Sequence, residues 1–264
     1  MANVFDSARL TFCRAEHHIN EFKSTISGFI NSNPWTRIVD KDSNPGKHIH
    51  KIKIIRDLPK MLPCILFDAA NNLRAVLDQA GYASAVAANS PSLKAVKFPF
   101  GPDEEHWRNN LAGGCKDLPA EIRAVFEEFK AYKGGNDTLW ALNEIANTKK
   151  HCALIPLKIS TSFVSFSAAI QLKKSNSAPV MIGDSPVLGA GWDAAKREVE
   201  LAICPANVEP QISGHFSFSV AIEDIEVARG QDARRVLDTM AHEVRNALST
   251  TEAKCLSLGF KLSD

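Results

Sequence analysis

The spacing of apolar residues changes near residue 152, and this change constrains the fold more than any single motif. Up to about residue 151, most apolar residues recur every three or four positions, which is typical of helices with one buried face. Beyond that point apolar and polar residues alternate, as in strands of a sheet with one buried face. We therefore predict an α+β protein in which a helical, bundle-like portion packs with an antiparallel β-sheet.

Turn and capping residues set the expected limits of the elements. Helices are predicted at 4–31, 63–87, 103–111, 119–132, 137–151 and 232–256. Strands are predicted at 35–39 and 48–56, as a hairpin, and at 153–159, 163–172, 198–204 and 215–225. We expect a mainly helical portion, 1–151, that includes the hairpin at about 35–56. The portion 152–264 would hold the sheet and the closing C-terminal helix, and both would form one integrated domain.

Composition limits what the chain is expected to bind and where it is expected to work. A net charge of +1 gives no global reason to expect a nucleic acid, a membrane or an acidic partner. No apolar run is long enough to cross a bilayer, and the N-terminus lacks a signal-peptide pattern. The six cysteines never form Cys-x-x-Cys, which argues against a zinc site. We therefore expect a cytoplasmic protein with no metal, cofactor or membrane partner.

Two predicted helices carry polar side chains on segments that otherwise favour burial. Asn71, Arg74 and Asp78 are spaced three and four residues apart, so they share one helix face, and Gln79 lies beside them. A second polar ridge consists of Asn143, Asn147, Lys150 and His151. Polar groups are costly to bury without partners. If the two helices pack together, the ridges form either a hydrogen-bond network that fixes helix register or a functional site.

The order of motifs resembles a family of bacterial hypothetical proteins. The shared motifs are Arg14-Ala-Glu-His-His-Ile, Asn72-Leu-Arg-Ala-Val-Leu-Asp-Gln, Phe98-Pro-Phe and Leu139-Trp-Ala-Leu-Asn-Glu-Ile-Ala-Asn-Thr-Lys-Lys-His. These motifs are in turn similar to those of HEPN helical domains of toxin–antitoxin and phage-defence systems. In HEPN domains, an Arg followed four to six residues later by His forms a metal-independent RNase site, usually across a dimer.

The resemblance assigns the Arg position to Arg74, but the His position holds Gln79. Metal-free RNA cleavage needs a general base, a general acid and a cation for the phosphorane. Arginine suits the phosphate and histidine suits proton transfer, whereas glutamine cannot transfer a proton. Position 152 is also Cys where the family usually has Arg. Asp78 or His151 would have to act as the base. The sequence therefore favours a non-catalytic protein and leaves a metal-independent RNase as the enzyme that it could be.

Three functions stay open at this point. The first is a non-catalytic binding or interaction protein with a HEPN-like helical portion; the second is a metal-independent endoribonuclease that uses Arg74 with Asp78 or His151. The third is a small-ligand binder with its site in a cleft between helices and sheet. RNA and a second copy of the chain are the partners that the resemblance implies. The candidate binding residues are Asn71, Arg74, Asp78, Gln79, Asn147, Lys150 and His151.

Overall fold

The structure is a computed structural model of residues 1–264. It describes all of them except 1–2, 44, 94–95, 148–153, 161–163, 173–179, 188–191, 207, 214–218 and 264. Only the backbone is described at 160, 164–172, 180–187, 202 and 208–213. Lys150 and His151, two of the predicted site residues, therefore lie outside the described residues.

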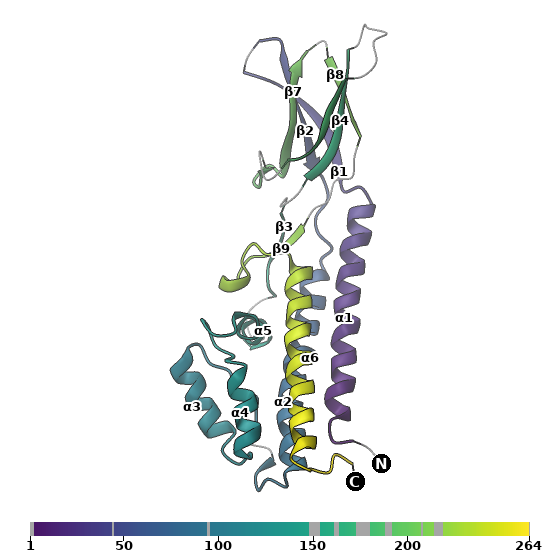
Figure 1. Cartoon of the computed structure of the whole chain (residues 1–264). Coiled ribbons are helices and arrows are strands. Elements are labelled where there is room, and N and C mark those ends of the chain that lie inside the picture. Colours follow the sequence, from purple (N-terminus) through teal and green to yellow (C-terminus); the bar gives the residue numbers. More distant parts are fainter. Residues whose placement is uncertain are drawn as a thin grey trace. The chain divides into compact units, whose positions relative to one another are not determined.

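The described residues form six α-helices and nine β-strands (Figure 1). The helices are α1 (Asp6–Asn31), α2 (Leu62–Ala87), α3 (Glu104–Gly114), α4 (Ala120–Glu128), α5 (Asp137–Asn147) and α6 (Ala233–Ser257). The strands are β1 (Trp35–Lys41), β2 (Lys47–Ile54), β3 (Leu157–Ser160), β4 (Val164–Leu172), β5 (Val180–Val187), β6 (Trp192–Asp193), β7 (Glu198–Pro205), β8 (Val208–Ser213) and β9 (Ser219–Ile222). A short 3₁₀-helix, η3 (Glu226–Ala228), precedes α6. Because antiparallel strands combine with helices and α6 packs on α2, α4 and α5, the predicted α+β class is confirmed.

Most predicted helices agree with the structure to within a few residues, and one is clearly too long. The helix predicted at 119–132 is α4, which ends at Glu128. Lys130 has a φ of 45°, in the left-handed region that stops a helix, and this conformation explains the early end. The helix predicted at 137–151 is described as far as Asn147. Strands β5, β6 and β8 were not predicted.

Tertiary contacts divide the chain into two compact units that are interleaved in the sequence. The helical unit comprises Met1–Ser24, Met61–Leu157 and Ile222–Asp264, and the sheet unit comprises Thr25–Lys60 and Lys158–Ala221. This division differs from the predicted portions 1–151 and 152–264. The hairpin belongs to the sheet unit and the closing helix belongs to the helical unit.

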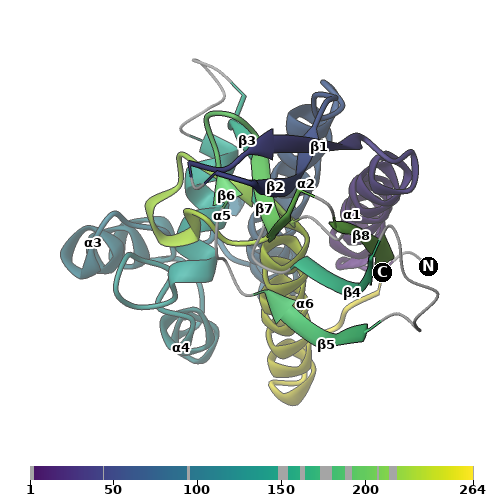
Figure 2. The same cartoon turned by 90° about the horizontal axis from the view of Figure 1, so that it is seen from above.

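Three long helices, α1, α2 and α6, lie side by side in the helical unit; α4 packs on α6, and α3 lies on the outer side of α4 (Figures 1 and 2). The apolar stripe of α1 faces the core, with Phe12, Ala15, Ile19 and Phe22 all buried. Proline in the first turn of α2 matches the preference for proline at a position whose N–H has no helical partner. Among the described residues, no helix is both long enough and apolar enough to pass through a membrane.

Three ion pairs, spaced seven residues apart on both helices, join α1 to α6: Arg9–Glu252, Glu16–Arg245 and Lys23–Asp238. We call this set the ion-pair ladder. The partner number on α6 falls as the number on α1 rises, so the two helices run antiparallel. The sign of the charge on α1 alternates along the ladder. A slip of one heptad would therefore place like charges opposite each other, which opposes a wrong register.

The sheet unit contains an antiparallel sheet with strand order β1-β2-β7-β6, a second sheet with order β5-β4-β8, and the pair β3-β9. Trp35 pairs with Ile54, so the predicted hairpin is present, with β1 two residues longer than expected. The apolar core of this unit includes Phe29, Ile52, Ile54, Ile159 and Val199.

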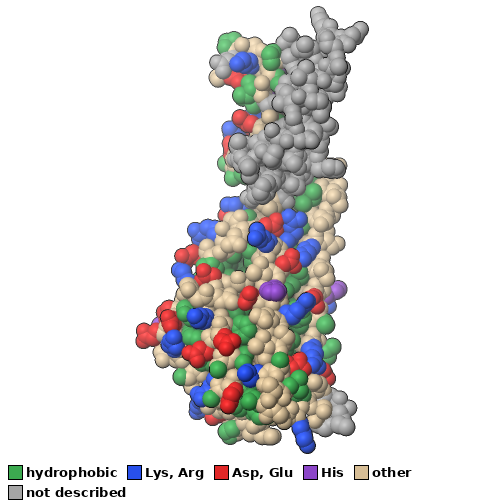
Figure 3. Space-filling view, in the orientation of Figure 1, with side chains coloured by type: hydrophobic (Ala, Val, Ile, Leu, Met, Phe, Trp, Pro, Cys, Tyr) green, Lys and Arg blue, Asp and Glu red, His purple; other side chains and the backbone are tan. Residues whose placement is uncertain are grey.

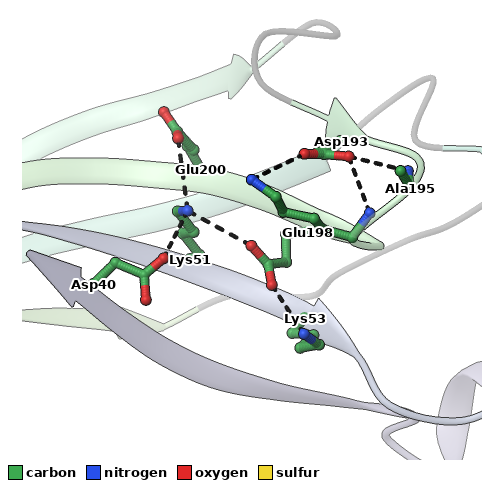
Figure 4. Close-up of polar contacts among 8 residues, drawn as sticks. Asp40, Lys51, Lys53, Asp193, Ala195, Glu198 and Glu200 are labelled. Carbon is green, nitrogen blue, oxygen red and sulfur yellow. Dashed lines mark hydrogen bonds and ion pairs between the residues drawn. The ribbon is translucent and has the colours of Figure 1, made fainter. Parts of the chain in front are cut away.

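A group of charged side chains lies on one face of the first sheet (Figure 4). The Nζ atom of Lys51 is 2.8 Å from Asp40 Oδ2 and 3.6 Å from Glu198 Oε2. Lys53 forms a second ion pair with Glu198, at 3.0 Å. The hydrogen bond between Lys51 and Asp40 lowers the pKa of Asp40 and raises the pKa of Lys51. Lys51 and Glu198 are both buried, and each has an oppositely charged side chain nearby that offsets the cost of burying its charge.

Candidate functional site

Arg74 is held in place by three different contacts in the helical unit. Its Nε donates a hydrogen bond to Asn143 Oδ1 at 3.2 Å, which joins α2 to α5. Its Nη1 lies 2.5 Å from Asp78 Oδ2, one helical turn further on, in an ion pair that lacks the alignment of a hydrogen bond. The guanidinium carbon also lies 4.1 Å from the centre of the Phe100 ring. The side chain keeps 15% of its surface exposed.

Asp78 connects this arginine to the loop of residues 98–102, which has the sequence Phe-Pro-Phe-Gly-Pro. Its Oδ1 accepts a hydrogen bond from the backbone N–H of Phe98 at 3.1 Å. The ring of Phe98 packs on Phe126, with ring centres 5.1 Å apart, and thereby anchors the loop in the core. Asp78 therefore uses one oxygen for Arg74 and the other for the loop.

A glycine is required where this loop meets α3. A Cβ atom at Gly101 would collide with the backbone nitrogen and the Cα of Trp107. Asn110, also on α3, fixes the loop from the other side, because its Nδ2 donates to the Phe100 carbonyl at 2.7 Å. The loop is thus clamped between α2 and α3, and Phe100 is held against Arg74.

The amide of Asn143 links Arg74 to the end of α5. Its oxygen accepts a second hydrogen bond, from Asn147 Nδ2 at 2.6 Å. The start of the same helix is fixed by Asn136, whose side chain accepts from the Leu139 N–H and donates to Glu243 on α6. α5 is therefore tied to α6 at its first turn and to α2 near its last turn.

These elements enclose a cleft of about 440 Å³ within the helical unit. Its walls include Arg74, Lys97, Phe100, Asn110, Asn143 and Asn147. Among the described residues at the cleft, Arg74 and Lys97 are cations, and Asp78 and Glu144 are carboxylates. The formal charge of this described set is therefore close to zero. The lining offers amide groups, an aromatic ring and backbone to a bound molecule.

The structure separates the predicted site residues into three groups. Arg74, Asp78 and Asn147 lie at the cleft, and Asn143 joins the two polar ridges there. Gln79 does not take part, because its Oε1 accepts a hydrogen bond from Ser7 of α1 at 3.4 Å. Asn71 is half-buried on α2 and is not among the lining residues, while Lys150 and His151 lie outside the described residues.

The sequence predicted no site residue among 97–110, although Phe98-Pro-Phe is one of the motifs that carry the resemblance. Phe100 and Asn110 are essential to the shape of the cleft, yet neither belongs to a periodic pattern of polar residues. The available signal was the run Phe-Pro-Phe-Gly-Pro, which combines aromatic residues with residues that restrict or relax the backbone.

The described groups at the cleft that could exchange a proton include the carboxylates of Asp78 and Glu144 and the thiol of Cys115. No histidine is among the described residues that line the cleft, and both oxygens of Asp78 are engaged. Cys115, behind the lining, donates its thiol hydrogen to the Lys97 carbonyl at 3.3 Å, and burial raises the pKa of this thiol to about 12. A thiol with that pKa is protonated near neutral pH and is a poor nucleophile.

A search for metal-binding side chains and comparisons with known proteins give no further information about the cleft. Among residues that the structure describes, no group of three or more His, Cys, Asp or Glu side chains could hold a metal ion. No family model, curated protein or solved structure matches this chain.

Proposed function

We propose that this chain is a non-catalytic binding protein that holds a small polar molecule in the Arg74 cleft. The observation that carries the proposal is the position of Arg74, which is fixed from three sides and still lines a cleft of about 440 Å³. Small-molecule sites are usually preformed clefts of about 300–1,000 Å³ with a few placed polar groups. Arg74, Asn143 and Asn147 are such groups.

The same geometry favours binding over catalysis. Gln79 stands where a HEPN-type RNase has its histidine, and it contacts α1 instead of the cleft. Asp78 would be the nearest alternative base, but Arg74 and the Phe98 N–H already occupy its two oxygens.

The charge distribution favours a small molecule over RNA. Figure 3 shows both signs of charge interspersed over the described residues on the visible face of the helical unit. Proteins that bind RNA tightly use clustered cations to displace counterions from the phosphates. We also propose that the helical portion around Arg74 is HEPN-like and that the chain works in the cytoplasm, as we expect from its sequence.

A cleft-filling variant tests the binding site. Asn147 is exposed at the end of α5, so Asn147→Trp should fill the cleft without disturbing the core. Asn246→Trp makes the same change at an exposed position of α6 outside the cleft. Saturation-transfer NMR with a mixture of small amides, carboxylates, amines and ring heterocycles should detect compounds that bind wild type and the Asn246 variant but not the Asn147 variant.

Two results would overturn the proposal. The first is that no compound in the mixture distinguishes the Asn147→Trp protein from the Asn246→Trp control. The second is cleavage of single-stranded RNA in the presence of EDTA that is lost in Arg74→Ala and retained in Arg235→Ala. Arg235 is an exposed arginine of α6, so its variant controls for loss of a positive charge. That outcome would assign the chain to the metal-independent RNases.

A further inference from the structure

The charge of Arg74 is already balanced by a carboxylate that cannot easily move away. Asp78 Oδ2 lies 2.5 Å from Arg74 Nη1, and its other oxygen accepts from the Phe98 N–H. Rotation of Asp78 away from the arginine would break the bond that anchors the 98–102 loop. An anion that approached Arg74 would therefore meet the negative charge of Asp78 as well.

The other charges among the described lining residues do not change this balance. Lys97 adds a positive charge to the lining and Glu144 adds a negative one. A site built for an anion normally presents an excess of cations or backbone N–H groups. The prolines at positions 99 and 102 have no N–H to contribute, so the 98–102 loop is a poor anion site.

The groups that stay available suit an uncharged partner. Toward described residues, the Asn143 amide nitrogen makes no hydrogen bond, and the side-chain oxygens of Asn110 and Asn147 accept none. These atoms supply one kind of donor and two acceptors, which match the two sides of an amide. The guanidinium of Arg74 is planar and rests on Phe100, and its exposed part can stack on another flat group.

We propose that the cleft binds a planar ring that carries an uncharged amide or amide-like edge, and that Asp78 determines this preference by neutralising Arg74. The inference rests on the proposed function, since it assumes that the cleft is the binding site. It differs from the role that the resemblance to RNases implies for Arg74, in which the arginine would hold a phosphate.

Two compounds of nearly identical shape separate the possibilities: benzamide is neutral and benzoate is an anion. Titrations followed by NMR should show that the wild-type protein binds benzamide about tenfold more tightly than benzoate. Asp78 already balances Arg74, so benzoate would lose its hydration without meeting an excess of positive charge. Cyclohexanecarboxamide, which keeps the amide but lacks a flat ring, should bind more weakly than benzamide.

Asp78 variants test the cause of the preference. Asp78→Asn keeps the shape and an acceptor for the Phe98 N–H but leaves Arg74 unbalanced, so benzoate should gain at least about tenfold relative to benzamide. Asp78→Glu keeps the charge and should keep the wild-type preference. Glu144→Gln removes the other carboxylate of the described lining, so it should shift the benzoate-to-benzamide ratio in the same direction as Asp78→Asn. It replaces Asp78→Asn as the test if the Asp78→Asn protein folds poorly.

The inference is wrong if wild type prefers benzoate, or if the neutralising variants leave the ratio unchanged. It is also wrong if compounds bind in the cleft but none of them is a flat, uncharged amide. If no compound depends on the cleft in the Asn147→Trp comparison, the failure belongs to the proposed function instead. The two failures are therefore distinguishable.

Discussion

Reversal of one rung of the ion-pair ladder should destabilise the helical unit, and reversal of both partners should restore it. The Lys23–Asp238 rung is the simplest to test, because its atoms are 2.5 Å apart and neither residue belongs to another ion pair of the described residues. Lys23→Glu places two carboxylates opposite each other, and Asp238→Lys places two ammonium groups opposite each other. The double variant rebuilds the pair with its direction reversed.

The expected size follows from the exposure of the two side chains, 36% for Lys23 and 56% for Asp238. Exposed ion pairs usually contribute about 0.2–1 kcal/mol, and unit charges about 4 Å apart in water interact by about 1 kcal/mol. A single reversal removes the attraction and adds a repulsion, so it should cost about 1 kcal/mol. For a chain of this size such a loss lowers Tm by about 2–4 °C.

Urea and thermal unfolding followed by circular dichroism would measure these changes in four proteins: wild type, both single variants and the double variant. The coupling energy from this cycle should be favourable by about 1 kcal/mol or more and should shrink in about 1 M salt. Lys116→Glu, an exposed charge reversal outside the ladder, should stay within about 0.5 kcal/mol of wild type. A double variant no more stable than the worse single variant would refute the register argument.

Three further predictions concern the cleft and its surroundings. Gly101→Ala should displace the 98–102 loop and weaken any ligand at least about tenfold, measured by the NMR titrations above; unchanged affinity would contradict a clamped loop. The hydrogen bond that His106 Nδ1 donates to the Asp103 carboxylate raises the pKa of His106 above its ordinary value of 6.5, so NMR should show that Asp103→Asn lowers this pKa. Because the folded pKa is raised, the contact stabilises α3 below about pH 6.5 and is lost as the pH rises through the His106 pKa. Iodoacetamide at about pH 8 should modify exposed Cys13 but not native Cys115, and equal rates would contradict the burial of Cys115.

Local periodicity predicted the helices well because each long helix buries a continuous apolar stripe. The spacing in α1 and α2 is sufficient to place Phe22 and Leu73 in the core without knowledge of their neighbours. The predicted C-terminal limit of α4 was wrong. The left-handed backbone of Lys130 ends the helix, and the spacing of apolar residues carries no signal for that conformation. Strands β5 and β8 were not predicted, because short runs that contain proline with glycine or serine carry a weak strand signal.

The candidate site was predictable only to the extent that it depends on helix faces. The spacing of Arg74 and Asp78 predicted that both lie on one helix face, where they form an ion pair, and the two polar ridges meet where Arg74 contacts Asn143. The aromatic partner, Phe100, comes from an irregular loop, and no pattern along α2 could indicate it. The ion-pair ladder could not be predicted either, because its pairs depend on how α1 and α6, more than 200 residues apart in sequence, align with each other.

Position 79 shows why a motif must be examined on its helix before it is assigned a role. A residue five positions after Arg74 is rotated by about 140° around an α-helix, so the side chains of 74 and 79 diverge. In the structure Gln79 indeed contacts Ser7 of α1, whereas Arg74 lines the cleft. Gln79→His, which completes the HEPN-type motif in the sequence, should therefore leave the protein unable to cleave single-stranded RNA in EDTA. Cleavage by this variant that Arg74→Ala abolishes would show instead that the two side chains can act together, within one chain or between two copies.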